Sequence, residues 1–220
     1  MLEKIRIGNI TEDIISRIQQ KIHRYNFTDK VLDTTHIVGY RNTASTINDI
    51  IGNYQPSVDE HTDPYESIAI DYMGNVQILS TETDKLFRHY TNLPTKIILK
   101  EGMRVMFLNN SLFTKGLFNG SIGVVLKIID NDTIQVTFPL KTGIANVIVV
   151  KETSYFRVNG IPSHCHQFPL QNAFALTVHK TQGLTLPHVT VSLDESICKW
   201  TSICSLEQSY IMGQLRNHII

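Results

Sequence analysis

A group of polar side chains in the last quarter of the sequence has the residue types that a phosphate contact requires. The group combines hydroxyls, an imidazole, an ammonium group and an amide beside a glycine, which lets the backbone approach a ligand closely. The same residue types also fit a capped helix end with a hydrogen-bonded histidine and a solvated lysine. The members of the group are Thr177, His179, Lys180, Gln182, Gly183 and Thr185.

An apolar run precedes this polar group and predicts the element that positions it. The run can pack along one face of a helix or strand, and we expect a helix over residues 170–182. The polar group then lies at the end of that element. A strand over residues 188–193 and a helix over residues 207–216 are expected to follow. The apolar residues are Phe168, Leu170, Phe174, Leu176 and Val178.

The N-terminal part predicts the beginning of an α/β sheet. Apolar residues recur at helical spacing over residues 1–25, with a second helix opening at Thr11, and residues 31–40 are rich in β-branched side chains. A helix is expected over residues 46–51, and residues 52–71 are expected to form a loop. Strand, polar cap and helix form the unit from which α/β sheets are built. The expected caps are Asn42, Thr43 and Ser45.

Between these two parts, the sequence predicts a small antiparallel barrel. Five short apolar segments follow one another with turn residues and no helix between them. Asn119-Gly120 is typical of a type I′ hairpin turn, and Gly123 permits a bulge or a sharp bend. An all-β insert therefore interrupts the α/β part. The segments are residues 97–100, 104–108, 122–129, 133–138 and 146–150.

Charge is distributed unevenly along the chain, although the 220 residues have no net charge. Residues 42–84 contain eight acidic side chains and no lysine or arginine, whereas residues 85–127 contain seven basic side chains and one acidic residue, Glu101. Such an asymmetry allows one surface to face phosphates. Two solvated faces without a partner explain the same charges equally well.

Composition excludes several classes of protein. The sequence has no apolar run of about 18 residues, so no membrane partner is expected, and its N-terminus lacks the pattern of a secretory signal. Cys165, Cys198 and Cys204 form an odd set that fits a reducing, intracellular compartment. Their spacing, with His164 and His166, matches no zinc pattern, so no metal site is expected and buried or idle thiols are favoured.

The polar group matches a helicase motif at every fixed position. An aromatic and apolar run followed by Thr-x-His-Lys-x-Gln-Gly-x-Thr resembles motif V of PIF-type DNA helicases of superfamily 1B. Residues 93–125 resemble the block of this family that contains Leu-Pro, Leu-Lys-x-Gly and Gly-Leu-x-Asn-Gly-x-x-Gly-x-Val. Residues 1–18 resemble its N-terminal helical segment, and residues 35–50 resemble its motif IV region.

The resemblance implies an α/β fold of the RecA-like, P-loop NTPase type. This would be the second motor domain of the helicase, carrying an inserted SH3-like barrel. The expected boundaries are 1–92 for the first part of this domain, 93–163 for the insert and 164–220 for the remainder with motifs V and VI. The implied function is ATP-dependent 5′-to-3′ DNA unwinding in repair or recombination. A RecD-like relative is an alternative, but the Gly116-Leu-Phe-Asn-Gly120 block favours the PIF type.

The resemblance also implies a role for each site residue. It implies that Gln182, Gly183 and Gln208 couple DNA contacts to the nucleotide cleft, and that Arg216 is the arginine finger. Here Leu215 occupies the position of the family's arginine and Arg216 follows one place later, which on a helix turns the side chain by about 100°. The implied DNA-binding residues are Thr177, His179, Lys180 and Asn42.

No Gly-x-x-x-x-Gly-Lys-[Ser/Thr] loop occurs in the 220 residues. The family carries this loop on a first RecA-like domain, which would hold most of the ATP and Mg²⁺ contacts. We therefore expect the chain to need that domain, in cis or in trans, and to be inactive alone. The implied partners are single-stranded DNA or DNA forks, and a eukaryotic source would place the protein in the nucleus or mitochondrion. The alternative function is a catalytically incomplete nucleic-acid-binding remnant of a helicase, of mobile-element origin.

Overall fold

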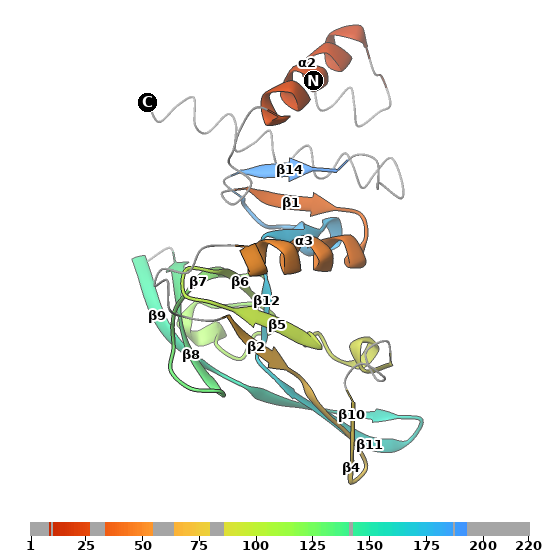
Figure 1. Cartoon of the computed structure of the whole chain (residues 1–220), viewed down its shortest axis with the longest axis vertical. Coiled ribbons are helices and arrows are strands. Elements are labelled where there is room, and N and C mark those ends of the chain that lie inside the picture. Colours follow the sequence, from red (N-terminus) through yellow and green to blue (C-terminus); the bar gives the residue numbers. More distant parts are fainter. Residues whose placement is uncertain are drawn as a thin grey trace. The chain divides into compact units, whose positions relative to one another are not determined.

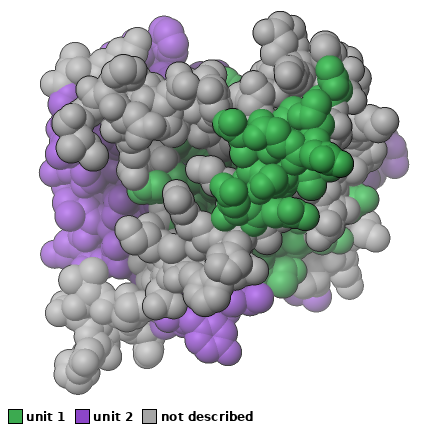
Figure 2. Space-filling model, turned by 90° about the horizontal axis from the view of Figure 1, so that it is seen from above, with its two compact units in different colours: residues 1–47, 174–220 green, residues 48–173 purple. Residues whose placement is uncertain are grey.

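The computed structural model describes residues 9, 11–26, 34–54, 64–79, 86–140, 143–186 and 188–192. The chain divides into two compact units, one made of residues 1–47 and 174–220 and the other of residues 48–173 (Figure 2). The segment predicted as an insert, residues 93–163, lies wholly within the second unit. The predicted helix over residues 207–216 lies outside the described residues.

The first unit is built on a parallel sheet of three short strands. Its order is β13-β1-β14, with β1 (Thr35–Val38) in the centre between β13 (Ala175–Thr177) and β14 (Val189–Val191), as Figure 1 shows for β1 and β14. All four residues of β1 are buried. A strand that is covered on both faces reads as a continuous apolar or β-branched run, which explains the composition of this segment.

Three helices are described beside these strands. The first, α2 (Glu12–Asn26), begins with acidic residues, and its Arg17 Nε lies 3.1 Å from Asp13 Oδ1. Next along the chain, α3 (Arg41–Tyr54) begins three residues after β1 and packs Ala44 against Val38. The third, α5 (Val178–Thr181), is a single turn that directly follows β13. None of the described helices is long and apolar enough to cross a membrane.

The second unit contains antiparallel sheets. The five-stranded sheet has the order β12-β6-β7-β8-β9, the four-stranded sheet has the order β10-β11-β3-β4, and β2 pairs with β5. The five-stranded sheet consists of β12 (Leu170–Asn172), β6 (Arg104–Phe107), β7 (Ile122–Ile128), β8 (Thr133–Leu140) and β9 (Gly143–Val150). The other strands are β10 (Glu152–Val158), β11 (Ile161–Gln167), β3 (Ile70–Met73), β4 (Val76–Ile78), β2 (Tyr65–Ile68) and β5 (Lys96–Leu99), with the short helix η1 (Phe113–Lys115).

Alternation along β8 shows why this segment forms a half-buried strand. Ile134, Val136 and Phe138 are fully buried, whereas the residues between them are partly exposed. Gly123 of β7 faces this row, and a Cβ built there would lie 2.7 Å from Phe138 Cδ1 and 2.7 Å from Thr137 O. The structure confirms all five predicted β segments, which form strands β5 to β9.

The structure corrects two expectations about turns. Gly123 is not at a bulge, because the register of β7 against β8 shifts between Val125 and Lys127. Close packing against Phe138 is what requires glycine there. The turn at Asn119-Gly120 is not of type I′ either, since that type needs a positive φ at both central residues and only Gly120, at 98°, has one. The backbone N–H of Ser121 donates to Phe118 O across this turn.

The helix predicted over residues 170–182 was wrong for most of its length. Residues 170–172 pair with β6 and residues 175–177 pair with β1, so the helix is confined to residues 178–181. Pairing with distant strands satisfies the backbone here and overrides the helical spacing of the apolar residues. The loop predicted over residues 52–71 is also wrong at residues 52–54, which belong to α3, and from residue 65 onward, where β2 and β3 begin.

The helix predicted over residues 46–51 is longer than expected. It begins at Arg41, so Asn42, Thr43 and Ser45 lie within the helix instead of capping it. Thr46 Oγ1 donates to Asn42 O at 3.0 Å, the usual back-bond of a threonine inside a helix. The earlier start brings the first turn of α3 directly to the end of β1.

Candidate nucleic-acid interface

The carboxyl ends of β1 and β13 lie side by side in the first unit. The two strands run parallel, with Val38 of β1 opposite Thr177 of β13. The segments that follow both strands therefore leave the sheet at the same edge. β1 leads into α3 at Arg41, and β13 leads into α5 at Val178. In open α/β sheets this edge is where ligands bind. We refer to Tyr40, Arg41, Asn42 and residues 177–183 as the strand-end site.

Two cations of the strand-end site, Arg41 and Lys180, lie near enough to affect each other electrostatically. Burial, followed by the positive charge of Arg41, lowers the pKa of Lys180 from 10.5 to about 8. Lys180 therefore still carries its proton at pH 7 for most of the time. An anion placed beside both side chains would reduce the repulsion between their positive charges. The electrostatics of this pair fit a phosphate group.

The start of α3 adds a further positive contribution. This helix has 14 residues and no acidic residue in its first turn. The aligned peptide dipoles of a helix give its N-terminus a partial positive charge, which favours anions. Arg41 and Asn42 are exposed in this first turn, beside the half-exposed ring of Tyr40. Helix dipole and side-chain cations thus lie at the same edge of the sheet.

The motif residues divide into a buried and an exposed group. Thr177 is 9% exposed at the N-cap position of α5, where its side chain makes no capping hydrogen bond, and Thr181 Oγ1 donates to Val178 O at 2.8 Å. His179 is exposed, and Lys180 is partly buried. The remaining exposed residues follow the helix and are Gln182, Gly183 and Thr185.

A left-handed backbone explains the glycine of the motif. Gly183 has a φ of 81°, and a Cβ built there would meet no atom within 4 Å among the described residues. Conformation therefore requires glycine here, and the open space lets a ligand approach the backbone. The structure brings Asn42 and the motif residues to one sheet edge. Gln208 and Arg216 lie outside the described residues, so their roles stay predictions.

Sequence reasoning missed Arg41 as a site residue. The only signal was its position between a β-branched strand and a helix, at a place where the family more often has threonine. Its effect on the pKa of Lys180 depends on strand pairing between segments about 140 residues apart, which no local pattern contains.

The described residues hold no group of three metal-ligating side chains. Cys165 is fully buried, and burial, reinforced by Asp71, raises the pKa of its thiol to about 12. A thiol in this state is neither a nucleophile nor a ready metal ligand. His164 and His166 flank Cys165 along β11, so they point to the opposite face of the strand. Cys198 and Cys204 lie outside the described residues.

Solved structures of Pif1 helicases share the fold of this chain, which indicates a RecA-like α/β fold. A Pif1 helicase from Candida albicans superposes with a TM-score of 0.72 at 21% identity, covering 94% of this chain and 50% of that one. A Bacteroides Pif1 bound to ssDNA superposes with a TM-score of 0.66 at 20% identity, covering 94% of this chain and 45% of that one.

The chain is similar in sequence to PIF1-type ATP-dependent DNA helicases. It is 26% identical over 193 residues to the PIF1 helicase of Xenopus laevis, which covers 88% of this chain and 28% of the relative. It is 26% identical over 221 residues to Pif1 of Bdellovibrio bacteriovorus, covering 99% of this chain and 44% of the relative. The chain thus spans less than half the length of these relatives. No protein-family model matches it.

Proposed function

We propose that this chain is the second RecA-like motor lobe of a PIF1-type 5′-to-3′ DNA helicase, and that its strand-end site holds the backbone of single-stranded DNA. In this proposal residues 93–163 form an SH3-like insert. The observation that carries the proposal is the pair of cations, Arg41 and Lys180, beside the first turn of α3.

The chemistry of the site supports a backbone contact. The positive charges of Lys180 and Arg41 act on each other, and an anion placed beside both would reduce their repulsion. The exposed His179, Asn42 and the backbone at Gly183 add hydrogen-bonding groups around the same edge. Such contacts position a nucleic acid and do not read its sequence. The ssDNA-bound Bacteroides Pif1, which shares this fold, supports DNA as the ligand.

In the same proposal, nucleotide chemistry takes place in a cleft between this lobe and a first RecA-like lobe. Gln182, Gly183 and Gln208 would couple the DNA contact to a nucleotide cleft that contains ATP and Mg²⁺, and Arg216 would face the phosphates there. A related Bacteroides Pif1 has been solved in complex with ADP-AlF3 and ssDNA, which supports a nucleotide partner. The first RecA-like domain is required in cis or in trans.

A second function is favoured by one feature of the sequence. Leu215 stands where the family's arginine is expected, and the 220 residues contain no phosphate-binding loop. A chain of this kind could hold nucleic acid without hydrolysing ATP. DNA-stimulated ATPase activity separates the two functions once a PIF1-type first lobe is supplied. Turnover that depends on Arg216 supports the motor, and binding without turnover supports the remnant.

The DNA contact is tested by fluorescence anisotropy with a labelled oligonucleotide. Lys180→Ala should raise the Kd about fivefold at 0.1 M salt, since one phosphate contact to a single strand releases about 0.7 counterion. Lys96→Ala is the matched control, because Lys96 is exposed and pairs with Glu66 at 3.3 Å. If Lys180→Ala and Lys96→Ala raise the Kd equally, the strand-end site is not the DNA contact.

A further inference from the structure

A row of three rings crosses the outer face of the four-stranded sheet. Tyr155 of β10 lies opposite His164 of β11, which in turn lies opposite Tyr72 of β3. The rings of Tyr72 and His164 are stacked, with centroids 4.7 Å apart and an interplanar angle of 14°. The rings of Tyr155 and His164 have centroids 5.6 Å apart and are tilted by 41°. We call Tyr72, His164 and Tyr155 the ring row.

The outermost ring of the ring row, that of Tyr155, is open to solvent. β10 is the outermost described strand on that side of the sheet, and the β10–β11 hairpin is visible in Figure 1. Tyr155 is 79% exposed, far more than a cross-strand packing role requires. The neighbouring Tyr72 and His164 are partly buried, so they fix the stack while Tyr155 presents its ring to the solvent.

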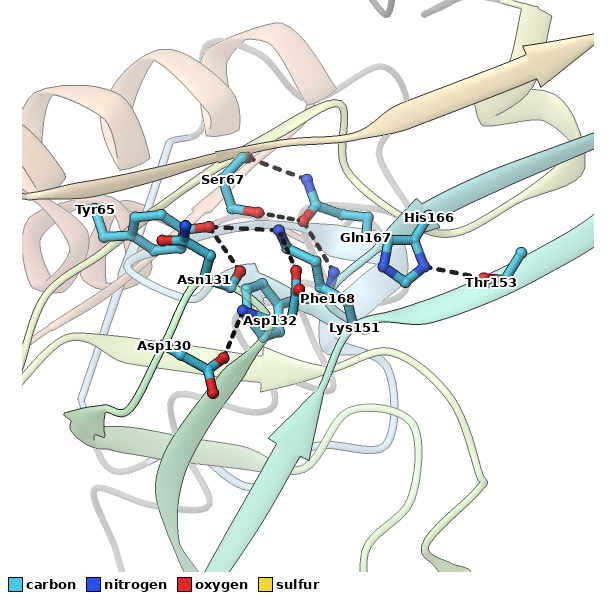
Figure 3. A network of polar contacts seen from close by, with 10 residues as sticks. All are labelled: Tyr65, Ser67, Asp130, Asn131, Asp132, Lys151, Thr153, His166, Gln167 and Phe168. Carbon is cyan, nitrogen blue, oxygen red and sulfur yellow. Dashed lines mark hydrogen bonds and ion pairs between the residues drawn. The ribbon is translucent and has the colours of Figure 1, made fainter. Parts of the chain in front are cut away.

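One positive charge on the same face, that of Arg157, can attract a phosphate. Arg157 is exposed two residues beyond Tyr155 along β10, so it projects from the same side at a distance of about 7 Å. His166 also lies on this face, where its Nδ1 shares a hydrogen bond of 2.9 Å with Thr153 Oγ1 (Figure 3). The carboxylates of these four strands, Asp71 and Glu152, both belong to the opposite face.

We propose that the ring row is a stacking platform for an unpaired base of single-stranded DNA, with a base on Tyr155 and the adjoining phosphate near Arg157. Stacking on aromatic side chains beside a basic track is how proteins hold single strands without reading their sequence. The platform rests on the proposed function for its choice of ligand. It differs from the strand-end site because its main contact is with a base, whereas the strand-end site contacts phosphate alone.

The test compares two oligonucleotides of about 15 nucleotides with equal charge, one of deoxythymidine and one that is abasic. Tyr155→Ala should raise the Kd for the deoxythymidine strand about fivefold or more and leave the Kd for the abasic strand unchanged. Tyr155→Phe keeps the ring and should bind like the unchanged chain. Tyr54→Ala is the matched control, because Tyr54 is 83% exposed elsewhere.

Each result has a separate meaning. If Tyr155→Ala weakens binding of the two oligonucleotides equally, or weakens binding of neither, the platform is overturned. Lys180→Ala should weaken both strands equally, so an effect of Tyr155 without one of Lys180 retains the platform and removes the strand-end site. Tighter Tyr155-dependent binding of oligouridine than of oligodeoxythymidine overturns the choice of DNA. Circular dichroism of each variant verifies that the fold is kept.

Discussion

The strand-end site and the ring row are built on two kinds of sheet and present different chemistry. Parallel strands end together at one edge, so the site there consists of residues that follow the strands, such as Arg41 and Lys180. Antiparallel strands place residues opposite one another across a face, so the second surface is a row of rings. Cations at an edge suit phosphates, whereas a row of rings suits bases.

This difference separates two measurable properties of DNA binding. Contacts between cations and phosphates weaken steeply as salt rises, because binding releases counterions. Stacking on a tyrosine depends on the base and responds little to salt. A chain with both surfaces should therefore bind with a salt slope set mainly by the first unit, and with a base dependence set by the second.

The largest effect is expected from Gly123→Ala, which disturbs the antiparallel unit alone. The new Cβ would lie 2.7 Å from both Phe138 Cδ1 and Thr137 O, and the second of these is backbone that cannot rotate away. We expect the free energy of unfolding to fall by about 3 kcal/mol, the upper range for overpacking a core. Urea denaturation monitored by circular dichroism measures this free energy of unfolding.

Gly52→Ala is the control for this substitution. Its Cβ would meet the flexible end of Met103 at 3.3 Å, and alanine also favours the helix, so the change should stay within about 1 kcal/mol. A free energy of unfolding for Gly123→Ala that matches that of Gly52→Ala would contradict the packing of β7 against β8.

A smaller effect is expected where a polar network joins β2 to the start of β8. Tyr65 Oη donates to Asn131 O at 2.8 Å, and Lys151 Nζ lies 3.4 Å from Tyr65 Oη and 3.1 Å from Asp132 Oδ1 (Figure 3). Tyr65→Phe removes the hydroxyl and should lower the free energy of unfolding by about 1 kcal/mol. Thermal denaturation of this variant and of Tyr155→Phe, whose stability should be unchanged, tests the network.

The smallest effect is a pH dependence that only the strand-end site should show. Phosphate binds protonated Lys180, whose pKa is lowered to about 8, so affinity for DNA should fall up to about fivefold between pH 7 and pH 9. Folding should respond in the opposite direction. The unfolded chain, with the ordinary lysine pKa of 10.5, binds more protons between pH 8 and pH 10.5, so stability due to this group rises over that range.

Lys180→Arg isolates the lysine as the source of both effects, because arginine stays protonated throughout this range. Anisotropy titrations at pH 7, 8 and 9 should show the fall in affinity for the unchanged chain and a flat profile for the variant. A fall of equal size in both proteins would assign the titration to another group.

Local patterns predicted the strands of the second unit well. Alternation such as Ile134, Val136 and Phe138 is a property of adjacent residues, so periodicity alone reveals it. The same rule gave a wrong prediction for the segment before Lys180. Its apolar spacing fits a helix, yet β6 and β1 take up residues 170–172 and 175–177 as strands, and those partners lie far away in the sequence.

The two surfaces differ in how far the sequence could reveal them. Lys180 belongs to a motif of consecutive residues, so its chemistry could be predicted, whereas its neighbour Arg41 depends on the pairing of β1 with β13. The ring row could not be predicted at all. Tyr72 and His164 are about 90 residues apart, and only the register between β3 and β11 brings their rings together.

The salt dependence of DNA binding tests the central claim most directly. The measurement compares the unchanged chain with the double variant Arg41→Gln/Lys180→Gln, using a single-stranded oligonucleotide from 50 to 300 mM salt. Two lost phosphate contacts should reduce the slope of log Kd against log salt by about 1.4, and Tyr155→Ala should leave the slope unchanged. An identical slope for the unchanged chain and the double variant would contradict the proposal that the strand-end site holds the DNA backbone.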